Sequence, residues 1–252
     1  MKTLNHSLSP AIVRKEQSMD HSLCYSGMFE KIYQAKIEFL NNRHITSKYE
    51  EIIRPEIIQS WERSKEYSLE IDNLICPKLE ESELDKLLGT KHFFLNAAKP
   101  YLERLRKVFA FTNNYAILTD EQGTVISEPL RIQISKNTYD VEKGMICNEK
   151  TSGTCSHTLT ILHKKPFQLW GPEHYSELLH KTIGSSAPIF DPLGNFAGTL
   201  TIVSDDNYHQ NAHTFGLLMT TAWSIQERFQ MTFNKKLLPL YTLIYFKMLL
   251  FS

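Results

Sequence analysis

The sequence contains little that would build a covalent or metal-based framework. Its four cysteines, Cys24, Cys76, Cys147 and Cys155, are sparse and include no C-x-x-C pair. This excludes a disulfide scaffold and a zinc ribbon. The ten histidines include no H-E-x-x-H motif and no short paired ligand spacing, so we expect neither a metal site nor a cofactor.

Signatures of catalysis and of nucleotide binding are absent too. There is no G-x-S-x-G nucleophile elbow and no G-x-x-x-x-G-K-[ST] phosphate loop. Lys plus Arg and Asp plus Glu balance at 28 each, so no net charge draws the chain to nucleic acid. The N-terminus lacks the apolar core of a signal peptide. The sequence therefore predicts a cytoplasmic protein that is not an enzyme.

A run of mostly apolar residues occurs at the C-terminus. Segment 237–251 holds fifteen residues, interrupted by Pro239 and Lys247, whereas a membrane-spanning helix needs roughly 20. We therefore expect no membrane partner. Three origins stay open for this tail: a truncation or reading-frame change, a docked terminal helix, and an interfacial anchor.

The first half of the chain shows helical periodicity. Helices are predicted over 28–41, over 54–67 with Pro55 in the first turn, and over 82–111 with a kink at Pro100. The leucine spacing of the third helix suits a helix packed on its own domain and a dimer seam equally well.

After Asn114 the pattern changes to strands and turns. Two β-hairpins are predicted, with strands at 115–119 and 124–127, then at 187–190 and 196–203. Between the hairpins lie a helix and an extended segment, and a last helix follows the second, at 152–162, 167–170 and 211–233 respectively. The predicted fold class is α+β, an antiparallel sheet with flanking helices.

Four segments resemble, in order and spacing, the sensor region of acetoin-regulator-like, sigma-54-dependent activators. They are Ile53-Arg-Pro-Glu-Ile-Ile-Gln-Ser-Trp-Glu-Arg-Ser64, Gly144 to His157, Pro166-Phe-Gln-Leu-Trp-Gly-Pro-Glu-His-Tyr175, and Ser186-Ala-Pro-Ile-Phe-Asp-Pro-Leu-Gly194. Each motif alone is weak, whereas four in the family's order are specific. The resemblance covers about residues 51–230.

The resemblance implies a GAF fold with helices on one sheet face, a small-molecule pocket on the other, and dimerisation through the flanking helices. Intact family members act on DNA and RNA polymerase through ATPase and helix-turn-helix domains, which this chain does not contain. We therefore expect a homodimer with no direct nucleic-acid contact. The predicted regions are a disordered N-terminus (1–27), a helical region (28–111), a GAF-like sensor domain (112–234) and an apolar tail (235–252).

The candidate effector site lies in the motif stretches, where aromatic walls and a few polar groups suit a ligand pocket. The predicted ligand-binding residues are Thr154, His157, Trp170, Glu173, His174, Tyr175 and Ser185. For His157 the alternative is a hydrogen bond within the fold. For Glu173 the alternative is a helix start after Pro172. Ser185 lies where family members often carry a cysteine, so we expect no thiol chemistry there.

The sequence leaves other functions open at lower rank. Cys147 and Cys155 are eight residues apart and could form a redox pair or hold a metal or haem. A ligand-free dimerisation or adaptor module is the main alternative to sensing. A GAF-fold methionine sulfoxide reductase is the second, although such enzymes need clustered redox cysteines. The sequence does not name the effector.

Overall fold

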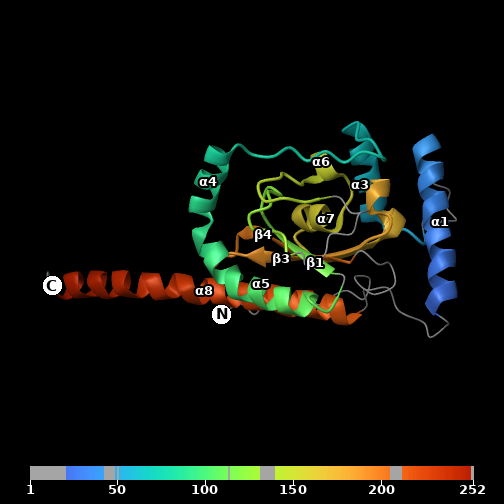
Figure 1. Ribbon diagram of the computed structural model, residues 1–252. Helices are drawn as coiled ribbons and strands as arrows, with labels where there is room; N and C mark the ends of the chain where they lie inside the picture. The colour runs from blue at the N-terminus through green and yellow to red at the C-terminus, as the bar shows by residue number, and fades with distance from the viewer. Residues whose placement is uncertain are drawn as a thin grey trace.

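The computed structural model describes residues 21–42, 49, 51–112, 114–130, 140–204 and 212–250, with side chains described between residues 27 and 234. A four-stranded antiparallel sheet in the order β1-β4-β3-β2 forms its centre (Figure 1). The strands are β1 (Asn114–Asp120), β2 (Phe167–Trp170), β3 (Ile183–Phe190) and β4 (Phe196–Ser204). Helices flank this sheet, so the predicted α+β class is confirmed.

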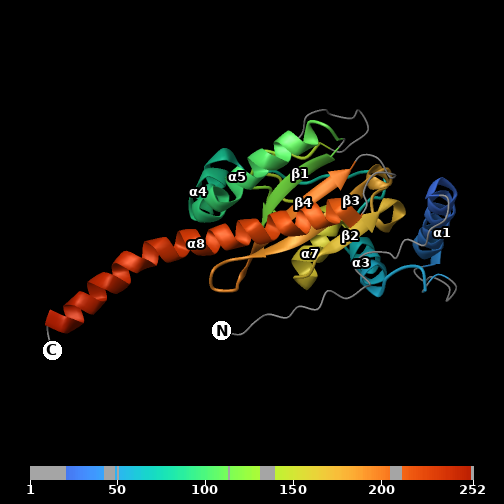
Figure 2. The same cartoon turned by 90° about the horizontal axis from the view of Figure 1, so that it is seen from below.

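One face of the sheet packs on two long helices that lie side by side, α5 (His92–Phe109) and α8 (Ala212–Leu250) (Figures 1 and 2). Alternate residues of a strand point to opposite faces, and Leu118, Leu200 and Ile202 point to this one. They join the buried side chains of both helices in the larger hydrophobic core. This layer covers one face of the sheet, so the site described below lies on the opposite face.

The opposite face is covered by α7 (Ser156–His163) and by the irregular chain around it. That chain includes the short helix α6 (Glu149–Ser152) and two 3-10 turns, η2 (Gly171–Glu173) and η3 (Glu177–Leu179). The register pairs Tyr115 with Val203 and Gly184 with Val203. Because paired residues share a face, these three positions form a floor beneath α7.

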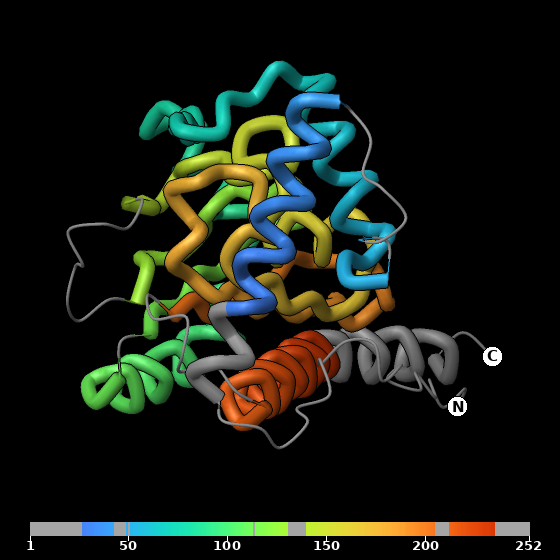
Figure 3. Tube along the Cα trace, turned by 90° about the vertical axis from the view of Figure 1, so that its right-hand side faces the viewer, coloured from blue at the N-terminus to red at the C-terminus, as the bar shows by residue number. Residues whose placement is uncertain are grey.

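Two N-terminal helices pack against the edge of the domain that carries β2. They are α1 (His21–Asn42) and α3 (Pro55–Glu66), which lie next to each other in Figure 3. Phe39 and Trp61 are buried and their rings lie 5.6 Å apart. Both helices share a second hydrophobic core with β2 and α7. The N-terminal helices therefore pack into the same folded unit as the sheet.

The prediction of one continuous helix over 82–111 is wrong. The structure has two helices, α4 (Glu81–Thr90) and α5, separated at Lys91 with φ −93° and ψ 5°. The chain continues as a helix through Pro100, nine residues after the break. Leu84 and Phe94 are both buried, so the apolar pattern runs across the corner. Helical periodicity shows which face of a helix is buried, but it does not show where one helix ends and the next begins.

The predicted helix 152–162 also starts too early. It is α7, preceded by the separate turn α6, with Gly153 between them at φ +63°. A Cβ at Gly153 would lie 3.0 Å from the Cβ of Tyr175 and 3.1 Å from the Oγ of Ser64. Positive φ and close packing together require glycine here.

The other elements agree with the sequence in kind. The extended segment 167–170 is β2, and the second hairpin is β3–β4. The Asp120–Gly123 turn forms as predicted, but its second arm makes isolated bridges to β1 and no full strand. The last helix extends to Leu250, beyond the predicted 233.

Some predictions fall on residues that cannot be compared. Residues 1–20, within the predicted disordered N-terminus, lie outside the described residues. The side chains of the apolar tail lie outside them as well. In the part of the chain that is described, no helix combines the length and apolar composition that crossing a membrane requires.

Candidate functional site

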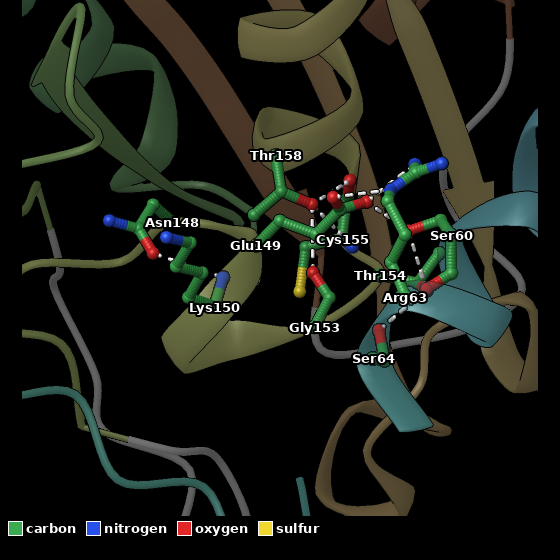
Figure 4. Close-up of polar contacts among 10 residues, drawn as sticks. All are labelled: Ser60, Arg63, Ser64, Asn148, Glu149, Lys150, Gly153, Thr154, Cys155 and Thr158. Carbon is green, nitrogen blue, oxygen red and sulfur yellow. Dashed lines mark hydrogen bonds and ion pairs between the residues drawn. The ribbon is translucent and has the colours of Figure 1, made fainter. Parts of the chain in front are cut away.

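The first two sequence motifs meet in space, where α3 contacts the start of α6 and α7 (Figure 4). Arg63 donates two hydrogen bonds to Glu149, from Nε to Oε2 at 2.7 Å and from Nη2 to Oε1 at 2.8 Å. Ser60 Oγ donates to Glu149 Oε1 at 2.6 Å, and Thr154 Oγ1 donates to Ser60 Oγ at 2.8 Å. This chain of charge-assisted bonds clamps α3 to the sheet domain.

The third motif is held by the same helix. Trp61 Nε1 donates to the backbone oxygen of Glu173 at 2.9 Å, and Arg54 Nη2 donates to the backbone oxygen of Gln168 at 2.6 Å. The Glu173 carboxylate accepts the backbone N–H of Trp170 at 2.9 Å and lies 3.4 Å from Arg54. These motif residues therefore connect elements to one another, and Glu173 has the capping role that the sequence offered as its alternative.

A cavity of about 50 Å³ lies between the sheet and α7. Its floor is the sheet face described above, and its walls come from α7, the α6 loop and the 174–182 segment. The lining residues are Tyr115, Ile117, Val141, Cys147, Ser152, Cys155, Ser156, His157, His174, Leu179, Thr182, Gly184 and Val203. None of these described side chains is an acid, a lysine or an arginine. The volume leaves room for roughly three or four water-sized groups.

His157 presents an unsatisfied polar atom to this cavity. Its side chain is buried, and its Nε2 has no hydrogen-bond partner among the described residues. The ring also makes a hydrogen bond to the backbone carbonyl of Cys147, and because Nε2 has no partner we assign this bond to the other ring nitrogen. Burial lowers the pKa of His157 to about 4, so the ring is neutral at pH 7. With its proton on the nitrogen that faces Cys147, the ring offers Nε2 as an acceptor.

His174 is the second imidazole of the cavity. Its Nδ1 lies 3.0 Å from the backbone oxygen of Gly171, which fixes the proton on that nitrogen. Its Nε2 lies on the floor side, beside Gly184 and Ser156. Burial lowers its pKa to about 4. The cavity thus carries two neutral imidazoles among hydroxyls, thiols and apolar side chains.

A buried lysine of α1 supports this wall from behind. Lys36 is 1% exposed, and its Nζ donates to the backbone oxygens of His174 and Tyr175 and lies 3.0 Å from Nε2 of His180. The amine thus donates to two backbone oxygens, and the His180 ring is its third neighbour. Burial lowers the pKa of Lys36 to about 7. The helix α1 is therefore tied to the segment that positions His174.

Only two of the seven predicted ligand-binding residues line the cavity, His157 and His174. Thr154 faces α3, and Tyr175 covers the Nζ of Lys36 at 5.6 Å. Trp170 packs edge-to-face on Phe29 of α1. Some of the motif residues predicted to form a pocket therefore line the cavity, and others contact the N-terminal helices.

Ser185 does not line the cavity either. It pairs with Ile202, so it lies on the sheet face that packs on α5 and α8. Its Oγ accepts a hydrogen bond from Nε2 of Gln168 at 2.9 Å. Its neighbours Gly184 and Ser186 point the other way. Ser185 was predicted as a ligand-binding residue from its place in the motif stretches, and the structure puts its side chain on the face away from the cavity.

The sequence analysis missed Lys36, Ser156 and Thr182. Lys36 carried a usable signal, since it occupies an apolar position of its helix between Ile32 and Phe39. A charged residue on a buried face needs partners. Ser156 and Thr182 had no such signal, because their roles depend on how the loops fold over the sheet.

Two of the three described cysteines also line the cavity, Cys147 and Cys155. All three described cysteines are buried thiols that form no disulfide. Hydrogen bonding to Cys76 and burial raise the pKa of Cys147, and burial raises that of Cys155. Over the described ranges, no three His, Cys, Asp or Glu side chains are grouped closely enough to hold a metal ion.

Comparison with known proteins identifies the sequence relationship. No protein-family model matches the chain. Over 192 residues, 75% of this chain, it is 30% identical to the acetoin dehydrogenase operon transcriptional activator AcoR of Bacillus subtilis (strain 168). The chain is homologous to this activator. The match covers 31% of AcoR, so the chain spans about a third of its relative's length.

The fold has a counterpart among solved structures. In the crystal structure of the E. coli DhaR(N)–DhaL complex, one chain superposes with a TM-score of 0.67 and 18% sequence identity. The superposition covers 78% of this chain and 67% of that chain. This likeness shows a shared fold, in which helices flank an antiparallel sheet, and the predicted fold class is confirmed.

Proposed function

We propose that this chain is the sensor part of a cytoplasmic transcriptional regulator, and that it binds a small uncharged molecule between the sheet and α7. The observation that carries the proposal is the Nε2 atom of His157, a buried acceptor without a partner at the wall of a cavity. Leaving such an atom unpaired costs about 1–3 kcal/mol. A ligand that donates a proton to it recovers that energy.

The chemistry of the lining restricts the ligand. His157 and His174 are both neutral at pH 7, and both have their protons directed to backbone carbonyls. They present acceptors, so the ligand must bring a hydroxyl or N–H donor. A charged ligand would enter a site with no described counter-ion on its walls. The cavity volume favours a molecule of few atoms.

The relatives support a regulatory role over an enzymatic one. The name of AcoR describes it as a transcriptional activator of the acetoin dehydrogenase operon. We propose that ligand binding shifts the packing of α5 and α8 in a homodimer and so reports occupancy to the rest of a regulator. DNA and RNA polymerase are contacted by other parts of such a regulator.

The test is a thermal-shift and calorimetric titration of the purified chain. The probes are acetoin, which the relative's name suggests, and a panel of small diols and hydroxyketones. A binder at 100 times its Kd stabilises the fold by about 2.7 kcal/mol. Absence of any shift across the panel would overturn the sensing proposal.

Two variants connect such a shift to the cavity. His157→Leu removes the acceptor and keeps the volume. Gly184→Ala adds a methyl group 2.7 Å from Oγ of Ser156 and 3.3 Å from Nε2 of His174, inside the cavity. Both should lose the ligand-induced shift and keep their native circular dichroism. A shift that persists in both would place the ligand elsewhere.

A protein partner is the second candidate, since the structural counterpart was crystallised as a complex with DhaL. The small cavity is compatible with this alternative. If no small molecule stabilises the chain, a protein-binding adaptor becomes the favoured function, and crosslinking of the full-length regulator in cells tests it directly.

A further inference from the structure

Three buried thiols meet around one serine at the rim of the cavity. The Sγ of Cys76 lies 3.2 Å from Oγ of Ser152, and the Sγ of Cys155 donates to the backbone oxygen of Ser152 at 3.4 Å. Cys76 and Cys147 pack together with Val125 in a small apolar cluster. Cys155 is outside that cluster. The sequence paired Cys147 with Cys155, whereas the structure pairs it with Cys76.

The backbone register brings Cys76 and Cys147 opposite each other. Segment 76–79 runs antiparallel to 144–147, with Leu79 N–H donating to Gly144 O at 3.0 Å and Ile146 N–H to Pro77 O at 2.8 Å. Lys78 and Met145 form the bridge between these two bonds. Two positions further along each segment, Cys76 faces Cys147.

This position suits a disulfide. The hydrogen bonds on either side of the bridge make Lys78–Met145 a non-hydrogen-bonded pair, and pairs of this kind alternate along a ladder. Cys76 and Cys147 come two positions after this isolated bridge, where an ideal ladder places Cα atoms about 4.5 Å apart, and their side chains pack together. Disulfides span Cα separations of about 4.4–6.8 Å.

We propose that Cys76 and Cys147 are a reversible oxidation site that forms a cross-strand disulfide with hydrogen peroxide as the oxidant. Cys76 is the more exposed of the two, at 7% against 2%. Its sulfur attacks the peroxide, the O–O bond breaks, and a sulfenic acid and one water form. The Cys147 sulfur then displaces hydroxide from the sulfenic sulfur. In total, two thiols and one peroxide give one disulfide and two waters.

Oxidation at this pair reaches the cavity through one residue. The Cys147 side chain lines the cavity, and its backbone carbonyl accepts the ring proton of His157. A disulfide would restrain both the side chain and the backbone carbonyl of Cys147. If the cavity binds an effector as proposed above, the oxidised chain should bind it with changed affinity. The disulfide itself does not depend on that function.

Peptide mapping after peroxide treatment tests the pair directly, because trypsin separates the three cysteines. Cys76, Cys147 and Cys155 fall on peptides 66–78, 144–150 and 151–164 respectively. The full chain is used with Cys24→Ala, which removes the remaining thiol. After peroxide and alkylation, mass spectrometry should show 66–78 linked to 144–150, and dithiothreitol should release both.

Matched single variants provide the control. Cys155→Ala should form the same link at an unchanged rate, whereas Cys76→Ala and Cys147→Ala should form no intramolecular link. Mapping of the otherwise native chain decides the question even if a variant folds poorly. A link between 144–150 and 151–164, or oxidation of single thiols to sulfinic acid without any link, would overturn the proposal.

Discussion

The buried amine of Lys36 shows how much of this fold depends on single polar residues. It is buried between α1 and the 174–180 segment, and its partners are two backbone carbonyls and the His180 ring. A buried amine without these acceptors would be very costly. With them, it fixes the helix to the wall that carries His174.

Replacing Lys36 by methionine should therefore destabilise the protein. The change leaves two buried carbonyls without donors, and each such group costs about 1–3 kcal/mol. Urea unfolding at pH 7 should show a loss of about 2–4 kcal/mol. Lys65→Met is the matched control, since Lys65 also donates to one carbonyl, that of Leu40, but is only half-buried. Equal losses in the two variants would contradict this interpretation.

At the scale of elements, α3 is the connector between the N-terminal region and the sheet domain. Ser60, Trp61 and Arg63 within α3, and Arg54 just before it, all donate to residues of the motif stretches. These residues belong to the motifs that resemble the family, and in the structure they hold the helices in place. Most motif residues of this chain therefore join α3 to the sheet domain and do not line the cavity.

The Arg63–Glu149 pair should show strong energetic coupling. Its side chains are 28% and 12% exposed, and the contact is bidentate. A double-mutant cycle with Arg63→Met and Glu149→Gln should give a coupling energy of about 1–3 kcal/mol in urea unfolding. The exposed Lys78–Glu142 pair serves as the control and should show no measurable coupling. If the Arg63–Glu149 pair also shows no measurable coupling energy, α3 is held by apolar packing alone.

At the scale of the whole molecule, several buried histidines make stability depend on pH. Burial lowers the pKa of His157 and His174 to about 4 and that of His180 to about 3. Their ordinary value is near 6.5. The neutral rings contribute stability that is present above pH 6.5 and lost as the pH falls toward 4.

The protein should therefore unfold readily in mild acid. Three protons taken up on unfolding give a slope of up to about 4 kcal/mol per pH unit below pH 6. Urea unfolding at pH 7, 6 and 5 measures this slope. His157→Leu should reduce it by about one third, because one proton is no longer taken up. If the slope is unchanged in that variant, His157 takes up no proton when the protein unfolds.

Much of the fold was predictable because local patterns determine it. Strand-like segments beside turn residues located β1, β3 and β4, the Asp191–Gly194 turn located the β3–β4 hairpin, and Pro55 located the start of α3. The corner at Lys91 was not predictable, since α4 and α5 present one continuous apolar face. His157 and His174 were predicted for the site, and both line the cavity.

The fold class, the order of the elements and the family follow from the amino-acid sequence, because they depend on periodicity, turn residues and motif order along the chain. The tertiary structure sets which polar residues face the cavity. A single step along β3 moves Ser185 to the helix face and leaves Gly184 on the cavity floor. It also decided that Cys76 faces Cys147, 71 positions away. Such partners are set by strand register and loop packing, which local sequence does not encode.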